Sequence, residues 1–135
     1  MQQESSPVIS LMVAVEDAPA AVEWYQKALG AIILWDLGSV VGLEINGAPF
    51  LVGEPENNGW ETPLKLGLPS VRIEVFCDDP DGFIARAIAA GAQGSTHVRN
   101  HQMPWGTHRQ GSFVDPFGHK WLVGDRSPLK AYPSK

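Results

Sequence analysis

An internal repeat is the feature that most constrains the fold of this chain. Residues 13–31 (VAVEDAPAAVEWYQKALGA) and residues 73–92 (IEVFCDDPDGFIARAIAAGA) have the same layout. Each runs from a short β-type segment through an acidic residue and a nearby proline to a helix-type segment that ends in Gly-Ala. A repeat of this size indicates two copies of one structural module.

Both predicted helices carry start and stop signals. Asp17 is the expected N-cap of the first, and Gly30 ends it. The second can be capped by Asp78 or by Asp79, with Pro80 in its first turn. Apolar residues recur at helical spacing in both segments, so each helix should bury one face.

The two halves also end alike, because residues 47–53 (GAPFLVG) and 118–124 (GHKWLVG) share four of seven residues at an offset of 71. Apolar runs predict three strands after each helix, with turns at Asn46-Gly47 and at Asp115–Gly118. The predicted strands cover residues 31–37, 39–45 and 50–54 in the first half, and 96–99, 107–114 and 120–124 in the second.

The order of these segments predicts an α+β fold of two tandem βαβββ modules in a single domain, residues 1–135. Module one covers about residues 8–54 and module two about residues 70–125, followed by a tail at 126–135. Residues 55–69 contain Asn-Asn-Gly and three prolines, so they are expected to form a linker loop.

Composition narrows the expected partners and location. Ten Lys and Arg against fifteen Asp and Glu give a net charge of -5 with no basic cluster, so neither nucleic acid nor a membrane is an expected partner. The start of the chain has no secretory pattern, and Cys77 is the single cysteine. We therefore expect a soluble, cytoplasmic protein.

The motifs EWYQKALGA in the first helix and DPFGHKW before the last strand resemble the vicinal oxygen chelate superfamily. This group includes glyoxalase I, extradiol dioxygenases, fosfomycin resistance thiol transferases and bleomycin-binding proteins. The resemblance covers about residues 8–125. It implies a curved, eight-stranded half-barrel around a cavity. The segment from Trp105 to Arg109 is most similar to the metal-free bleomycin-binding and PhnB-like branches.

In metal-dependent members, a divalent ion is held at four symmetry-related points. Counted onto this sequence, the resemblance places those points at Ser10, Leu51, Arg72 and Leu122. A leucine offers no donor atom and an arginine repels a cation, so we expect neither the family metal site nor any other cofactor. A separate metal site built from His97, His101 and His108 stays open.

Two charges lie on the first predicted strand of module two, where Arg72 and Glu74 alternate with apolar residues. Period-two alternation puts both on one face, which the resemblance makes the cavity face. They could form a structural ion pair with Glu44. Alternatively, Arg72 would hold an anionic or carbonyl group of a ligand and Glu74 an amine or amide.

Ligand contacts are also predicted at aromatic and polar positions. Trp35, Trp60 and Trp105 could stack on a planar ligand, whereas Trp24 and Trp121 are expected in the core. On the strand after Trp105, alternation would turn three polar side chains toward the cavity: His108, Gln110 and Ser112. His119, just after a turn glycine, is expected at the surface.

The functional expectation is a metal-independent protein that binds a small planar or amphipathic molecule in the cavity, with an antibiotic among the candidates. The alternative is a lyase or isomerase of the glyoxalase type in which Glu74 or Glu44 acts as general base. Resemblance also implies a homodimer, and the exposed edge of an open half-barrel supplies a physical reason.

Overall fold

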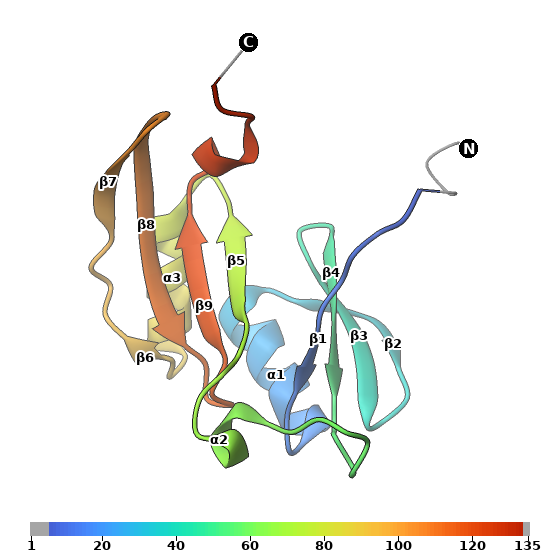
Figure 1. Cartoon of the computed structure of the whole chain (residues 1–135). Coiled ribbons are helices and arrows are strands. Elements are labelled where there is room, and N and C mark those ends of the chain that lie inside the picture. Colours follow the sequence, from blue (N-terminus) through green and yellow to red (C-terminus); the bar gives the residue numbers. More distant parts are fainter. Residues whose placement is uncertain (1–5, 134–135) are drawn as a thin grey trace.

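The computed structural model describes residues 6–133, and it places their strands in two separate sheets, each with one long helix on one face (Figure 1). The predicted α+β class and the tandem order of the modules are confirmed. Within the described residues, no helix is both long and apolar enough to cross a bilayer.

The first sheet has four strands in the order β1-β4-β3-β2, with β1 parallel to β4 and the other pairs antiparallel. Asn46 and Gly47 have φ angles of 49° and 87°. Positive φ at both positions is the turn geometry that matches the twist of a two-residue hairpin, as predicted. The strands are β1 (Met12–Ala14), β2 (Ile32–Asp36), β3 (Val40–Ile45) and β4 (Ala48–Gly53).

The second sheet has five strands, in which β9 lies between β5 and β8, and both β6 and β7 pair with β8. The nine strands of residues 6–133 therefore form two sheets that are not closed into a barrel, rather than one sheet of eight strands. The strands are β5 (Arg72–Phe76), β6 (Gln93–Gly94), β7 (Arg99–Met103), β8 (Gly106–Val114) and β9 (Lys120–Gly124).

The strand predicted at residues 96–99 is wrong, because β7 begins at Arg99, where that strand was expected to end. Its sequence, Arg-Asn-His-Gln-Met, has no alternation of apolar and polar residues, and four of its five side chains are exposed. An edge strand without a buried face gives no periodic signal.

Capping residues explain where the two long helices begin. Asp17 accepts a hydrogen bond of 3.1 Å from the backbone N–H of Ala20 at the start of α1 (Ala18–Leu29). Asp79, and not Asp78, does the same for α3 (Pro80–Ala89), with Gly82 N–H as donor at 3.0 Å. The helix α1 buries the apolar residues that recur at helical spacing, Ala21, Val22, Tyr25, Ala28 and Leu29, and also Ala18.

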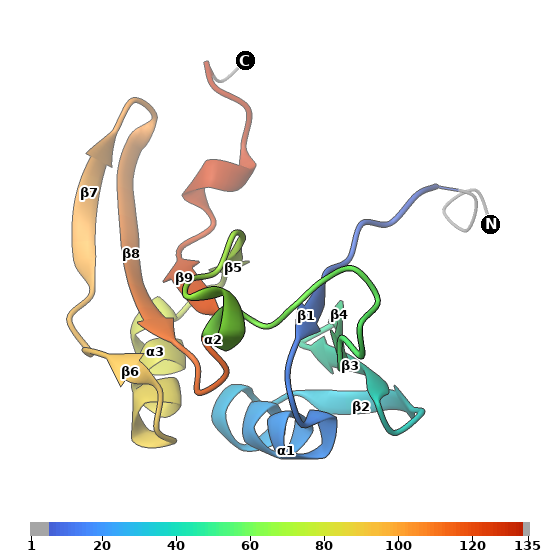
Figure 2. The same cartoon turned by 60° about the horizontal axis from the view of Figure 1, so that its bottom comes forward.

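The linker and the tail contain more structure than expected. Residues 63–66 of the predicted loop form a short helix, α2 (Pro63–Leu66), which Thr62 caps through a 3.3 Å bond from Lys65 N–H. The segment after β9 forms one turn of 3₁₀ helix, η2 (Ser127–Leu129). In Figure 2, α2 lies on the connection between the two sheets.

The two modules are joined by a buried carboxylate. Asp115, in the turn before β9, is 2% exposed and accepts hydrogen bonds from Tyr25 Oη at 2.5 Å and Trp121 Nε1 at 2.9 Å. Since Tyr25 belongs to α1 and Trp121 to β9, the contact crosses the module boundary. Trp24 adds a 2.9 Å bond from its Nε1 to the carbonyl of Ala90. Figure 2 shows the two long helices on the same side of the sheets.

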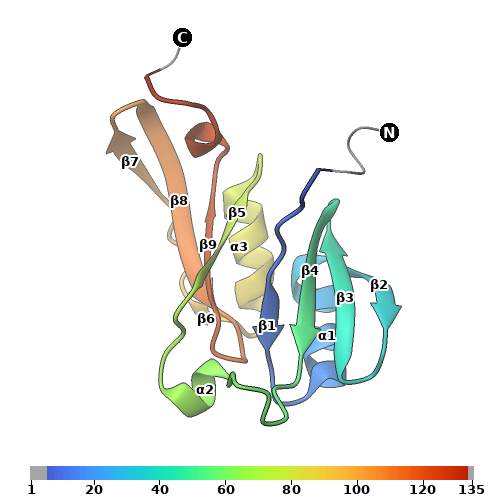
Figure 3. The same ribbon diagram turned by 45° about the vertical axis from the view of Figure 1, so that its right-hand side comes forward.

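His119 corrects an expectation, because it is buried rather than exposed at the surface. Its Nε2 donates to the carbonyl oxygen of Ala14 in β1 at 2.7 Å. Figures 1 and 3 show β1 and β5 as the strands nearest the seam between the sheets. His119 therefore ties the turn of module two to the first strand of module one.

Candidate functional site

The second sheet carries a hollow of about 700 Å³ on the face turned away from α3. Register explains which side chains reach it. Arg72 is paired with Lys120, Ser112 with Leu122, and Gln110 with Arg99, so these side chains project from one face. The alternate residues Phe113, Trp121 and Val123 are buried in the core instead. The lining comes from module two and the end of the linker: Pro69, Arg72, Gly94, Ser95, His97, Arg99, His101, Gln110, Gly111, Ser112, Lys120 and Leu122.

Three of the side chains that the sequence singled out for ligand contact meet in this hollow: Arg72, Gln110 and Ser112. Two lining cations were missed. Lys120 lies two residues before Leu122 in a correctly predicted strand, so alternation could have found it. Placing Arg99 in the lining requires the pairing register of β7 with β8, which the sequence does not show.

The charge of the lining is one-sided. It contains three of the ten Lys and Arg residues and two of the four histidines, but none of the fifteen Asp and Glu residues. In a chain with a net charge of -5, the hollow therefore gathers three cations and no carboxylate in its lining.

Glu74 does not line this hollow. It is exposed on β5 and borders a separate hollow of about 430 Å³ that also touches Cys77 and Arg126. Among the described residues, Arg72 has no carboxylate within 4.0 Å, so the ion pair with Glu44 or with Glu74 does not form. Arg72 and Glu74 are therefore both exposed, and only Arg72 lines the hollow.

The three candidate tryptophans lie elsewhere. Trp35 covers Gly42 on the first sheet, where a Cβ atom would come within 2.5 Å of its ring. Trp60 borders a hollow of about 300 Å³ at the seam, next to Met12 and Val71. Trp105 donates from Nε1 to Ser127 Oγ at 2.9 Å. None of the three lines the hollow on the second sheet of the described chain.

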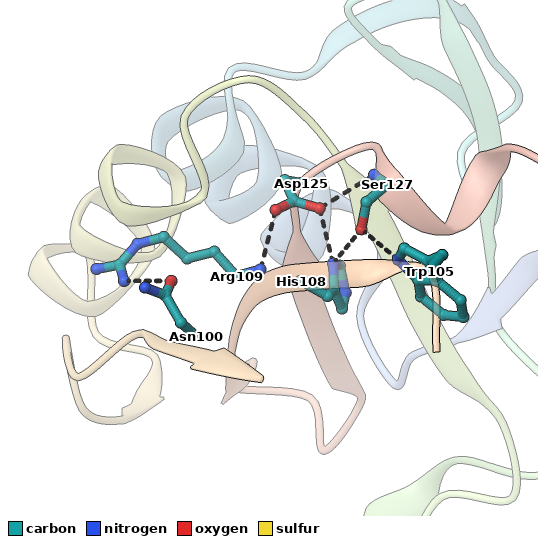
Figure 4. A network of polar contacts seen from close by, with 6 residues as sticks. All are labelled: Asn100, Trp105, His108, Arg109, Asp125 and Ser127. Carbon is teal, nitrogen blue, oxygen red and sulfur yellow. Dashed lines mark hydrogen bonds and ion pairs between the residues drawn. The ribbon is translucent and has the colours of Figure 1, made fainter. Parts of the chain in front are cut away.

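His108 shares a face with Gln110 and Ser112, as alternation predicted, but its ring is held by another network (Figure 4). Its Nδ1 lies 2.8 Å from Asp125 Oδ1, and its exposed fraction is only 5%. The same carboxylate accepts from the backbone N–H of Arg109 at 2.9 Å and of Ser127 at 3.0 Å. His108 is therefore not available to orient a ligand through Nδ1.

These donors lower the pKa of Asp125 well below the usual aspartate range. The backbone N–H of Arg109 has the largest effect, burial opposes it, and hydrogen bonds from His108 and Ser127 add to it. No sequence pattern indicated this network, because Asp125 and Ser127 lie beyond the last predicted strand.

Ser127, His108 and Asp125 are the residue types of a hydrolytic triad, but their geometry differs from one. A triad places the serine and the carboxylate on opposite ring nitrogens of the histidine. Here Ser127 Oγ lies 3.2 Å from Nδ1, the nitrogen that already contacts Asp125. The network instead attaches η2 to the β7–β8 hairpin through Trp105 and His108.

The arginine of the Trp105–Arg109 motif links β8 to α3. Arg109 Nε and Nη2 each lie 2.7 Å from an oxygen of Asp81, and its Nη1 donates to Asn100 Oδ1 at 3.1 Å. This two-point pairing lowers the pKa of Asp81 and raises that of Arg109, with the hydrogen bond as the largest cause in each. The guanidinium group of Arg109 is therefore paired with Asp81 and Asn100 within the fold.

The four points where related folds hold a metal do not fit a divalent ion. Leu51 and Leu122 are aliphatic, Arg72 is a cation, and Ser10 Oγ donates to the carbonyl of Pro49 at 3.0 Å. No group of three or more His, Cys, Asp or Glu side chains in residues 6–133 is placed to hold a metal ion, the histidines at 97, 101 and 108 included.

Comparisons with known proteins agree with this fold. A family profile described as a glyoxalase-like domain matches residues 10–123. The uncharacterized protein Rv0887c of Mycobacterium tuberculosis is 34% identical over 131 residues, covering 87% of this chain and 74% of that protein.

Among solved structures, a glyoxalase/bleomycin resistance protein from Albidiferax ferrireducens has a TM-score of 0.67 at 20% identity, covering 87% of this chain and 98% of that one. The fosfomycin resistance protein FosX from Mesorhizobium loti has a TM-score of 0.61 at 13% identity, covering 89% and 92%. At these identities the structural likeness concerns the fold. The profile match over most of the chain shows that the chain belongs to the glyoxalase-like family.

Proposed function

We propose that this protein binds a small organic molecule in the hollow on its second sheet, without a metal ion. The observation that carries the proposal is the convergence of Arg72, Gln110 and Ser112 on a space of about 700 Å³. That volume lies within the range of small-molecule sites, roughly 300–1,000 Å³. Amide and hydroxyl groups beside an apolar floor at Leu122 are suited to orienting a ligand rather than to reacting with it.

An antibiotic is one candidate ligand. Support comes from the names of similar structures, which include a fosfomycin resistance protein and a glyoxalase/bleomycin resistance protein. In this proposal the protein acts by stoichiometric capture, so it lowers the free concentration of the molecule without changing it. We also propose a cytoplasmic location, since Cys77 is the only cysteine and no disulfide holds the fold.

We propose further that two copies of the chain form the complete site. All five residues of the edge strand β2 are exposed, including Ile32, Leu34 and Trp35 at 55%, 49% and 42%. An apolar edge strand of this kind is prone to pairing with another chain. Since no tryptophan lines the hollow within one chain, a second copy would supply the flat apolar surface for a planar ligand.

Calorimetric titration of a ligand found by thermal-shift screening tests the binding proposal. Gln110→Ala and Ser112→Ala each remove one neutral hydrogen-bonding group, so affinity should fall about two- to tenfold. Gln26→Ala, on the exposed face of α1, is the matched control and should bind as the wild type does. Unchanged affinity in both hollow variants would contradict the proposal.

A lyase or isomerase with Glu74 as general base is the second candidate. It is favoured by the position of Glu74, which is paired in register with Leu122 and so lies one strand from the floor of the hollow. Glu74→Gln keeps the side-chain shape and removes the base. Loss of turnover in this variant would support the enzyme, whereas intact fold and affinity with no turnover in the wild type would support the binding protein.

A further inference from the structure

We infer that the ligand of the hollow is an anion, and that Arg72, Arg99 and Lys120 bind its phosphate, phosphonate, sulfate or carboxylate group. This inference rests on the proposed function and gives the ligand a chemical class. It also separates this protein from a binder of cationic drugs, which would need acidic groups in the hollow.

Pairing distinguishes these cations from Arg109 and Arg126, whereas Arg86, also outside the hollow, donates to the backbone carbonyl of Lys27 at 3.1 Å. Arg109 and Arg126 lie outside the lining of the hollow, and each has an aspartate partner, Asp81 at 2.7 Å and Asp78 at 3.1 Å. In the described chain, by contrast, neither Arg72 nor Arg99 nor Lys120 has a carboxylate within 4.0 Å. The fold therefore brings together three positive charges that it does not neutralise.

Strand register places these charges around neutral donors. Arg72 and Lys120 are partners on β5 and β9, whereas Arg99 comes from β7, on the far side of β8. Between them, Gln110 and Ser112 project from β8. Guanidinium groups donate two parallel hydrogen bonds to an oxyanion, and the amide and hydroxyl can donate to its remaining oxygens.

The flexible reach of these side chains allows them to converge on one group. Arg72 and Arg99 start three strand spacings of about 4.8 Å apart, and their long side chains can reach toward the space between them from opposite sides. Leu122 adds an apolar side chain to the lining beside the three cations. A compact anionic group attached to an uncharged body would satisfy both parts of the lining.

Because the molecule as a whole is negatively charged, an anion can be attracted only by the positive side chains in the hollow itself. At a net charge of -5, the molecule repels anions at long range, so a general electrostatic attraction cannot account for their binding. Glu74 is the acid nearest in sequence to Arg72, and it is exposed at the sheet edge rather than in the lining.

The test compares three probes that share a phenyl ring and differ in charge: phenylphosphonate, phenyltrimethylammonium and benzyl alcohol. Amide shifts of the isotope-labelled protein locate each probe, and calorimetry gives its affinity. We expect phenylphosphonate to shift the amides of Gln110, Ser112 and Lys120 and to bind more weakly as salt is raised.

Charge-removing variants identify the groups responsible. Arg72→Gln, Arg99→Gln and Lys120→Gln should each weaken phenylphosphonate binding about tenfold or more, because each removes a charge-assisted hydrogen bond. Lys27→Gln, on the exposed face of α1, removes the same charge far from the hollow and should leave affinity unchanged. Circular dichroism confirms that each variant is folded.

The outcomes separate the two proposals. If benzyl alcohol or phenyltrimethylammonium shifts the same amides and phenylphosphonate does not, the anion inference is overturned while the hollow remains a binding site. If Lys27→Gln weakens binding as much as Lys120→Gln, the attraction is general and the inference is again overturned. If phenylphosphonate shifts only amides outside the hollow, the anion inference is overturned as well. The proposed function is then decided separately, by the calorimetry of Gln110→Ala and Ser112→Ala.

Discussion

At the residue scale, Asp115 is a buried carboxylate that relies on several hydrogen-bond donors. Its two oxygens accept from Tyr25, Trp121 and the backbone N–H groups of Phe117 and His119 at 2.5–3.0 Å, and the residue is 2% exposed. A buried carboxylate is tolerated only when hydrogen bonds replace its lost hydration. One residue therefore fixes a turn, an aromatic core and the contact between modules.

Asp115→Ala should lower the free energy of unfolding by about 3–5 kcal/mol, because it leaves several buried donors without an acceptor. Tyr25→Phe removes only one of the donors and should cost about 1–2 kcal/mol. Urea unfolding followed by circular dichroism measures both changes. A loss under about 1 kcal/mol in Asp115→Ala would mean that the network contributes little to stability.

Asp125 should make stability depend on pH in acid. Its folded-state pKa is lower than its unfolded value, so the folded protein binds this proton less readily than the unfolded chain does. The stabilisation is therefore complete above the ordinary aspartate pKa of about 3.9 and is lost as the pH falls below it. Urea unfolding between neutral pH and about pH 3 should show a shallower decline in Asp125→Asn than in the wild type. Parallel declines would indicate that other carboxylates dominate.

At the scale of single elements, sequence signals were strongest where one face is buried. The strand Lys120–Gly124 and the Asp17 cap of α1 are as predicted, because apolar spacing and capping chemistry are local properties. The strand β7 and the helix α2 were missed. The first has no buried face, and the second lies among prolines that usually mark loops.

The candidate site was predictable only in part for the same reason. Alternation along β5 and β8, with the cavity face taken from the resemblance, selected Arg72, Gln110 and Ser112, but it selected Glu74 and His108 as well, which do not line the hollow. It could not show that Asp125 would hold His108, since contacts between side chains distant in sequence depend on tertiary packing. Placing His119 at the surface failed for that reason as well, because its partner Ala14 lies in the other module.

The two candidate caps of α3 allow a matched comparison. Asp79→Ala removes the acceptor for Gly82 N–H and should cost about 1 kcal/mol of stability. Asp78→Ala removes only an exposed pairing with Arg126 and should change stability by less than about 0.5 kcal/mol. Thermal unfolding of the two variants distinguishes them. Equal effects would mean that capping at this helix does not depend on Asp79.

At the scale of the whole molecule, the two sheets differ in what they expose. The first sheet exposes apolar side chains along β2, and the second presents a cationic hollow. A ligand with a planar body and an anionic group would suit both surfaces if two copies bring them together. The two modules therefore repeat one fold but expose different surfaces, an apolar edge strand in module one and a cationic hollow in module two.

Light scattering at micromolar concentration should give the mass of a dimer. Leu34→Lys puts a charge on the exposed edge strand β2 and should shift the protein toward monomers. Leu129→Lys adds the same charge at an exposed position in η2 and should leave the mass unchanged. A wild-type monomer throughout the micromolar range would contradict the dimer proposal.

The most direct measurement of the central claim is an amide chemical-shift map of the labelled protein with a bound ligand. The account predicts the largest shifts in β8 and β9 around Gln110, Ser112 and Lys120, next to the hollow of about 700 Å³. Shifts concentrated instead around Met12 and Trp60 at the seam, or around Glu74 and Cys77, would place the binding site elsewhere and contradict it.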